Sequence, residues 1–354
     1  MPRQTGIQAV TAAQQLSKSF PSVGIQPLPR PVTPGRATAA EVGIADGDSI
    51  TFFVIGDHGG IKAPSPQNAV SYAMQRAGAA HAAFTYSVGD IVYFNGDAGE
   101  YAPQFYEPYA HLAMPIVGIP GNHDGDTTDD PTRAPLDTFM ANFCTAAPAV
   151  PPGDPQLEYG RHTQTQPWCD WTLALRAVTI VGVYSNVPSG GHFERSQIDW
   201  LAAELRAAPA DRPLIVTLHH PPFSVDAHHG GSARMRDALD GAFQTAGRVP
   251  DLVLSGHVHD YQRFSRTVQG TTVPYIVIGN SGYHNLHLLA SDARPGEVVP
   301  GSTGVVLEYG DASEYGFLTL TVAGGKISGT YTGVKPGRMP DGSDATITPA
   351  KDTF

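Results

Sequence analysis

The sequence predicts an α/β fold whose strands are buried on both faces. From residue 49 onward, five short apolar runs rich in β-branched residues each end abruptly in polar residues. Segments with helical apolar spacing lie between some of these runs, so strand and helix alternate along the chain. Continuous apolar runs bounded by Gly or Pro are typical of sheets covered by helices.

The five runs are, in order, "ITFFVIGDHGG", "AFTYSVGDIVY", "MPIVGIPGNHDGD", "RPLIVTLHHPPF" and "PDLVLSGHVHDYQR". Helical spacing is found in "SPQNAVSYAMQRAGAAHA", between the first two runs, and in "ERSQIDWLAAELRAAP", before the fourth. The second of these helices is expected to start at Ser196 and stop at Pro209. In such sheets ligands bind beyond the carboxyl ends of the strands, so the polar residues there mark the expected site.

The chain divides into three regions. Residues 1–48 are expected to form an N-terminal extension, with a short helix within Ile7 to Phe20 and then an extended Pro-rich stretch, "PSVGIQPLPRPVTPGR". Residues 49–335 form the α/β body, which ends in the strands "TVPYIVIGNSGYHN", "YGFLTLTVAGG" and "KISGTYTGV", with a hairpin around Gly324-Gly325. Residues 336–354 are expected as a C-terminal tail.

Composition limits the classes of partner. The 354 residues carry 33 acidic and 22 basic side chains, a net charge of −11 with His neutral. This charge disfavours nucleic acid and anionic membranes, but not an anionic substrate where metal ions reverse the sign locally. No apolar run approaches the roughly 20 residues of a membrane helix, and no secretory signal is visible. The compartment, the oligomeric state and the pairing of Cys144 with Cys169 stay open.

The strand ends carry a dense set of metal-binding residue types. Asp57, Asp90 and Asn122 follow the first three runs, and His219 follows the fourth. The last run ends in "GHVH", which places His257 and His259 two residues apart, so in an extended segment both rings leave the same face. Each motif alone fits a capped turn or a buried polar residue, but five in this order favour a metal site.

This order resembles that of the calcineurin-like metallophosphoesterases, over roughly residues 50 to 335. More narrowly it resembles the purple acid phosphatases, whose blocks match "DHG" at 57–59, "GDIVY" at 89–93, "GNHD" at 121–124, "VTLH" at 216–219 and "GHVH" at 256–259. Many other members of the superfamily carry a His where Gly59 stands, and here a Tyr appears in the second block instead. The resemblance implies a fold of four layers, two mixed β-sheets face to face with helices outside, and a dinuclear catalytic domain over residues 49–335.

The resemblance also implies the ligands of two metals that share Asp90 as a bridge. The first metal would be held by Asp57, Asp90, Tyr93 and His259, and the second by Asp90, Asn122, His219 and His257. A free phenol stays protonated at neutral pH, so Tyr93 indicates a strong Lewis acid such as Fe(III), paired with divalent Fe, Zn or Mn. Read alone, Tyr93 in "IVYF" would be a core residue.

The function implied is hydrolysis of phosphate monoesters, with metal-bound hydroxide as the nucleophile and a small phosphate ester as substrate. His123 is the first candidate for the proton donor to the leaving group, and Asp124 is expected to orient it. His228 and His229, nine and ten residues after His219, are expected near the substrate phosphate. The alternatives are a phosphodiesterase or phosphotriesterase on the same site, an iron redox enzyme that handles peroxide, and a metal-holding binding module.

Overall fold

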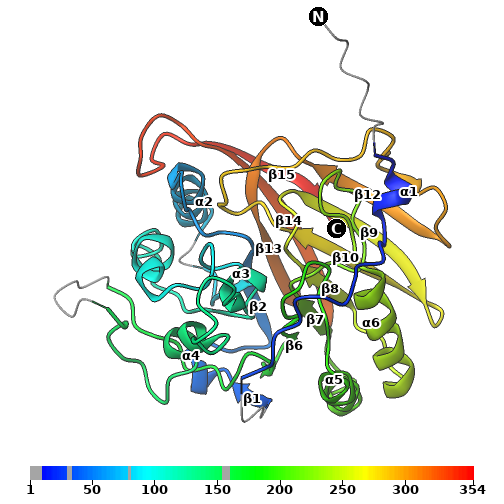
Figure 1. Ribbon diagram of the computed structural model, residues 1–354, viewed down its shortest axis with the longest axis horizontal. Coiled ribbons are helices and arrows are strands. Elements are labelled where there is room, and N and C mark those ends of the chain that lie inside the picture. Colours follow the sequence, from blue (N-terminus) through cyan, green and yellow to red (C-terminus); the bar gives the residue numbers. More distant parts are fainter. Residues whose placement is uncertain (1–9, 30–33, 79–80, 154–159) are drawn as a thin grey trace, which may run out of the picture.

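Two mixed β-sheets lie face to face in the computed structural model, with helices on their outer sides (Figure 1). The structure describes residues 10–29, 34–78, 81–153 and 160–354. One sheet has six strands in the order β15-β14-β13-β2-β3-β4, and the other has nine in the order β1-β5-β6-β7-β8-β10-β9-β12-β11. The four-layer α/β fold that the sequence predicts is confirmed.

The six-stranded sheet comprises β2 (Ser49–Ile55), β3 (Thr85–Ser87), β4 (Ile116–Gly118), β13 (Tyr315–Ala323), β14 (Lys326–Lys335) and β15 (Thr346–Thr353). The nine-stranded sheet comprises β1 (Gly35–Thr38), β5 (Trp171–Ala174), β6 (Thr179–Val183), β7 (Leu214–Leu218), β8 (Leu252–Ser255), β9 (Tyr261–Val268), β10 (Thr271–Ile278), β11 (Glu297–Val298) and β12 (Val305–Asp311). The α-helices are α1 (Ala12–Gln15), α2 (Ser65–Arg76), α3 (Asn122–Gly125), α4 (Asp137–Phe143), α5 (Arg195–Ala207) and α6 (Ala233–Ala246).

Successive side chains of the central strands point to opposite faces of each sheet, and together they build three apolar layers. In β2, Phe52 and Val54 face the nine-stranded sheet, whereas Phe53 and Ile55 face α2 and the chain beyond it. In β7, Ile215 joins the layer between the sheets, and its neighbours Leu214 and Val216 pack with residues of α5 and α6. Every strand that precedes a polar motif is therefore buried on both faces, which fixes where its last residue lies.

All five apolar runs form strands, namely β2, β3, β4, β7 and β8, and both helical segments form helices. Helix α5 begins one residue earlier than expected, because Glu194 rather than Ser196 lies at its N-cap. The hairpin between β13 and β14 turns at Gly324 and Gly325, both with positive φ (57° and 74°), as a two-residue turn of this kind requires.

Both flanking segments add strands to the sheets. Within residues 1–48, the described part includes α1 and β1, which pairs parallel to β5. Within residues 336–354, β15 pairs antiparallel to β14 as an edge strand. Its sequence, "TITPAKDT", is polar and contains Pro349, which an edge position tolerates. Among the described residues, no helix is long and apolar enough to cross a membrane.

Candidate metal centre

The carboxyl ends of five strands meet at one edge of the two sheets. Strands β2, β3 and β4 are mutually parallel, and so are β7 and β8. The six-stranded sheet therefore delivers Asp57, Asp90 and Asn122 to this edge, and the nine-stranded sheet delivers His219 and the "GHVH" segment. Neither sheet alone carries the whole donor set.

The backbone at three of these positions adopts the left-handed conformation, with φ of 51° at Asp57, 53° at Asp90 and 68° at His257. Residues other than Gly rarely adopt it, and such strain is typical of functional sites where the surrounding structure holds a side chain in place. Tight packing at Gly121 adds to the constraint, because a Cβ there would lie 2.1 Å from Oδ1 of Asp90.

Asp57, Tyr93 and His259 form one half of the centre. The Tyr93 hydroxyl lies 3.4 Å from Oδ1 of Asp57, and Nε2 of His259 lies 3.5 Å from the same oxygen. Nδ1 of His259 donates to the Asn285 carbonyl at 3.1 Å, which leaves the Nε2 lone pair facing the centre. Tyr93 is fully buried, as a core residue would be, yet its oxygen points at a carboxylate.

Asp90, Asn122, His219 and His257 form the other half. Nε2 of His219 lies 3.1 Å from Oδ1 of Asn122 and 3.4 Å from Oδ2 of Asp90, and Nδ1 of His257 lies 3.0 Å from Oδ1 of Asn122. Nδ1 of His219 donates to the Val88 carbonyl at 2.9 Å, so its Nε2 is also free to bind an ion. One donor atom each from Asp90, His219 and His257 lies within 4.8 Å of the others.

The electrostatics of these groups fit cations. Burial raises the pKa of Asp57 well above its usual value, and burial with the neighbouring Asp90 and Asp57 raises that of the Tyr93 phenol. Burial opposes the charged form of His219, but the same two carboxylates outweigh it and raise its pKa to about 9. Among the described residues neither carboxylate pairs with Lys or Arg. Buried carboxylates of this kind are paired or bind metals, and the donor set of oxygen and imidazole suits iron, zinc or manganese.

Gly59 is tightly enclosed beside Tyr93. A Cβ at position 59 would lie 2.6 Å from Oε1 of Gln104, 2.8 Å from the Ile91 carbonyl oxygen and 2.9 Å from Cδ2 of Tyr93. A side chain at position 59 is therefore incompatible with the observed loop, and the Tyr93 ring is one of three groups that exclude it.

Asp124 does not orient His123, contrary to the expectation from the sequence. Its buried carboxylate accepts the backbone N–H groups of Ile91, Val92 and Gly121 at 2.7–3.2 Å. It therefore ties the loop after β3 to the loop after β4, which is a positioning role for the segments that carry Asp90 and Asn122. The sequence did not predict this role of Asp124, because the groups that it binds are backbone N–H groups, which every residue type except Pro carries.

Aromatic side chains form one wall beside the centre, called here the aromatic wall: Tyr93, Phe94, His123 and Tyr283. The ring centroid of Tyr93 lies 4.2 Å from that of Tyr283 and 4.6 Å from that of His123, and the Phe94 ring lies 5.7 Å from His123. The backbone N–H of His123 donates to Oδ1 of Asp90 at 3.0 Å, which places its ring directly beside the donor set. Nδ1 of His123 is buried without a partner among the described residues.

Imidazoles form a second wall, called here the histidine wall: His228, His229 and His287. The centroid of His229 lies 4.7 Å from that of His257, and the centroid of His287 lies 4.5 Å from that of His259. His228 and His229, expected from the sequence near the substrate phosphate, lie in this wall, and that role stays a prediction. From its place after a strand, the sequence suggests His287, like His284, only as a residue at the rim of the site, and no motif spacing points to Phe94 or Tyr283.

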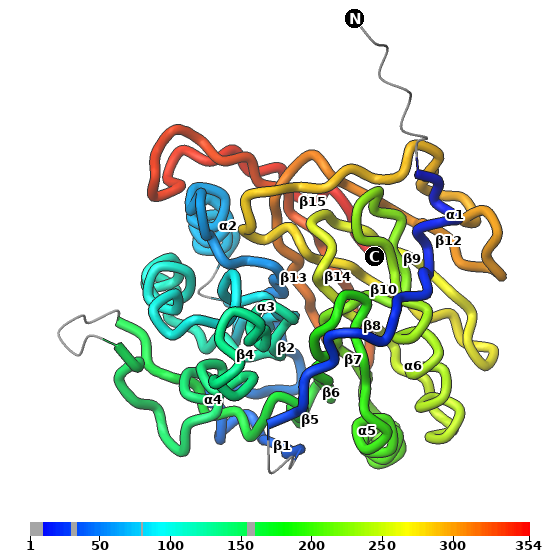
Figure 2. The backbone as a smooth tube through the Cα atoms, viewed as in Figure 1, coloured from blue at the N-terminus to red at the C-terminus, as the bar shows by residue number. Residues whose placement is uncertain are grey.

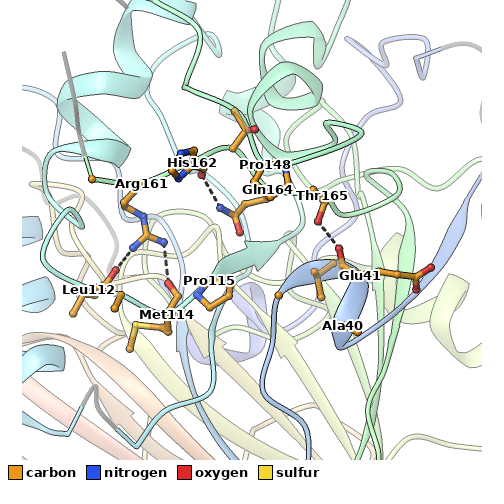
Figure 3. Close-up of a pocket in the computed structure, with 15 residues that line it drawn as sticks. Ala40, Glu41, Leu112, Met114, Pro115, Pro148, Arg161, His162, Gln164 and Thr165 are labelled. Atoms are coloured by element: carbon orange, nitrogen blue, oxygen red, sulfur yellow. Dashed lines mark hydrogen bonds between the residues drawn. The ribbon is translucent and has the colours of Figure 1, made fainter. Parts of the chain in front are cut away.

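A separate pocket of about 340 Å³ lies away from these residues, beside Leu112, Pro115 and residues 160–165 (Figure 3). Arg161 extends along it and donates to the carbonyls of Tyr109, Leu112 and Met114. Its guanidinium therefore binds backbone, and the pocket contains none of the predicted metal or catalytic residues.

A family model described as calcineurin-like phosphoesterase matches residues 50–261, which run from β2 through "GHVH" to the start of β9. The chain belongs to the calcineurin-like phosphoesterases. The cluster of Asp90, His219 and His257 lies within the matched residues, and it has the ligand types that a metal-dependent phosphoesterase requires.

Individual relatives differ in length of match. The cAMP/cGMP dual specificity phosphodiesterase MT0825 of Mycobacterium tuberculosis is 26% identical over 260 residues, 70% of this phosphoesterase and 71% of that protein. Purple acid phosphatase 22 of Arabidopsis thaliana is 40% identical, but over 98 residues, 25% of this chain and 22% of that protein. The structure of purple acid phosphatase PPD1 from yellow lupin has a TM-score of 0.58 at 16% identity, covering 86% of this chain and 53% of that one, which shows a shared fold.

Proposed function

We propose that this phosphoesterase hydrolyses phosphate monoesters with a mixed-valence dinuclear centre. Trivalent iron would be held by Asp57, Asp90, Tyr93 and His259, and a divalent ion by Asp90, Asn122, His219 and His257. The observation that carries the proposal is the buried Tyr93 hydroxyl, which lies 3.4 Å from Oδ1 of the buried Asp57 carboxylate. A phenolate adds a third negative charge to two carboxylates, and a trivalent–divalent pair balances three charges better than divalent ions do.

When bound, the two ions supply an acidified water as nucleophile and neutralise charge on the phosphoryl group. The residues of the chain position the ester and handle the proton of the leaving group. His123 is the proposed acid, because its ring lies beside the donor set and carries a buried Nδ1 without a partner. His228 and His229 are proposed to donate N–H groups to phosphoryl oxygens from the histidine wall, next to His257.

Phosphodiester hydrolysis is the second candidate, and a specific observation favours it. The relatives aligned over more than half of this chain include MT0825 and the 3',5'-cyclic-nucleotide phosphodiesterase alr5338 of Nostoc, 30% identical over 57% of the chain. The matches to purple acid phosphatases of Arabidopsis cover a third of the chain or less. Length of match favours diesters, whereas the Tyr93 position favours the iron chemistry of the first candidate.

A panel of esters separates the candidates. The protein is loaded with Fe(III) and Zn²⁺ and assayed without oxidant on an aryl phosphate, a diaryl phosphate, a triaryl phosphate and cyclic AMP, with Asp90→Asn as the control for contaminating phosphatases. We expect kcat/KM for the monoester to exceed the other values by at least about tenfold. A larger value for the diester or cyclic AMP assigns the second candidate, and absence of turnover on every ester contradicts both.

A further inference from the structure

The histidine wall brings three ring nitrogens together without using any proposed ligand of the dinuclear centre. One ring nitrogen each of His228, His229 and His287 lies within 4.8 Å of the others. The first two follow β7 and the third follows β10, and a bridge between Asp226 and Leu289 joins the two loops. The cluster is therefore held by the fold and is not a chance approach within one loop.

A buried carboxylate stands behind the cluster. Asp226 is fully buried, and its Oδ2 accepts Nδ1–H of His287 at 2.8 Å. With the proton on Nδ1, the lone pair of His287 is on Nε2. Asp226 also accepts the backbone N–H groups of His228 at 2.6 Å and His229 at 3.4 Å, so one carboxylate orients the whole cluster. Metal-binding imidazoles almost always have such a partner on their other nitrogen.

We propose that the histidine wall is a third metal site, which binds a divalent ion of the zinc type through His228, His229 and His287. Three imidazoles with an open fourth position are a ligand set that Zn²⁺ accepts. The site has no carboxylate ligand and includes the exposed side chain of His228, so it binds more weakly than the dinuclear centre and fills at higher free zinc. It goes beyond the proposed function and does not depend on ester hydrolysis.

The position of this site gives zinc a regulatory effect. The centroid of His229 lies 5.9 Å from that of His259 as well as 4.7 Å from that of His257, so a bound ion stands against the dinuclear centre. An ion there uses the ring nitrogens of His228 and His229 that would otherwise face phosphoryl oxygens. Excess zinc therefore inhibits hydrolysis in competition with the ester.

The test measures metal binding directly. Protein already loaded at the dinuclear centre is dialysed to equilibrium against increasing free Zn²⁺, and bound metal is counted. Wild type should bind three ions per chain, and His228→Ala should bind two. His228 is exposed, so its loss leaves the fold intact. His284→Ala, which changes a nearby imidazole outside the cluster, is the matched control and should bind three.

Asp226→Asn supplies a second measurement. Loss of a carboxylate behind a metal ligand typically weakens binding by about 10–100-fold, so the third ion should need that much more free zinc while the first two stay bound. A wild type that saturates at two ions up to millimolar zinc overturns the inference, as does a third ion bound equally by wild type and His228→Ala. Either failure leaves the ester assays above untouched.

Discussion

The two walls of the centre differ in chemistry although they flank the same ions. The aromatic wall presents one phenyl ring, two phenols and a single imidazole, that of His123. The histidine wall presents three imidazoles that a buried carboxylate, Asp226, orients. A single imidazole among aromatic rings suits the leaving group, whereas a wall of several imidazoles suits the phosphoryl oxygens or a cation. On the proposed function, the two walls therefore serve different halves of the reaction.

Asp90→Asn should have the largest effect, because it removes the carboxylate that is proposed to bridge both ions. A bridging carboxylate serves two ions, and a neutral amide oxygen does not replace its charge. We expect less than one metal per chain and activity at background. Metal analysis of the purified variant checks this, and two tightly bound ions would remove Asp90 from the bridging role.

His123→Ala tests the aromatic wall. General acid catalysis is worth about 10²–10⁴-fold, so kcat for an alkyl phosphate should fall by that factor while both metals remain. An aryl phosphate with an acidic leaving group needs less protonation and should lose much less. The ratio of the two losses is the measurement, and equal losses for both esters would count against His123 as the acid.

His229→Ala tests the histidine wall. A hydrogen bond to a charged group contributes about 1.5–3 kcal/mol, so KM for the monoester should rise by roughly tenfold or more, equally for alkyl and aryl esters. Burial, with His259 and His287 nearby, lowers the pKa of His229 to about 3, so its ring is neutral above about pH 4. The KM ratio of variant to wild type should therefore be constant between about pH 5 and 8.

A constant KM ratio would support a histidine wall made of neutral donors. A KM ratio that changes with a titration near pH 6.5 would mean that His229 is charged, and would contradict this. His284→Ala serves as the control again and should leave KM unchanged.

Tyr93→Phe should have the smallest effect on stability but a decisive effect on colour. A phenolate bound to Fe(III) gives a charge-transfer band in the visible, so concentrated wild type should be violet to pink and the variant colourless. The Phe ring keeps the packing against His123 and Tyr283, so Tm should change only modestly. Tyr283→Phe removes a neighbouring phenol instead and should keep the band. A coloured Tyr93→Phe variant, or an iron-loaded wild type without the band, would mean that Tyr93 is a packed core residue and not a metal ligand.

The strands that end in polar motifs were predictable because burial on both faces leaves an uninterrupted apolar run. Edge strands such as β15 leave no such run, since one side of their backbone and much of their surface faces water. The short, isolated pairing of β1 with β5 depends on a partner more than 130 residues away, which local patterns do not encode.

The predicted donors and proton donors lie together, because strand ends in parallel sheets converge on one edge. Their assignment to particular ions remains a prediction. The sequence did not predict which side chains pack around these donors. His287 follows β10 and becomes a neighbour of His229 only through the packing of two loops, and Phe94 and Tyr283 are ordinary aromatic residues until the fold places them beside His123.

The N-terminal segment has a consequence for any shortened version of the chain. Its residues 12–29 run from α1 across the front of the molecule, over loops of the nine-stranded sheet (Figure 2). The Leu16 carbonyl accepts the Ser224 N–H at 3.0 Å, and the Gln15 carbonyl accepts the Gly231 N–H at 2.8 Å. The Lys18 N–H donates to the Gly231 carbonyl at 2.7 Å, and the Lys18 carbonyl accepts the Ala233 N–H at 2.9 Å. These hydrogen bonds hold both ends of the loop that contains His228 and His229. A chain trimmed to begin at residue 49 would keep every motif of the family but lose the bonds that hold that loop. We expect such a protein to bind its metal ions as the full chain does and to bind its ester more weakly.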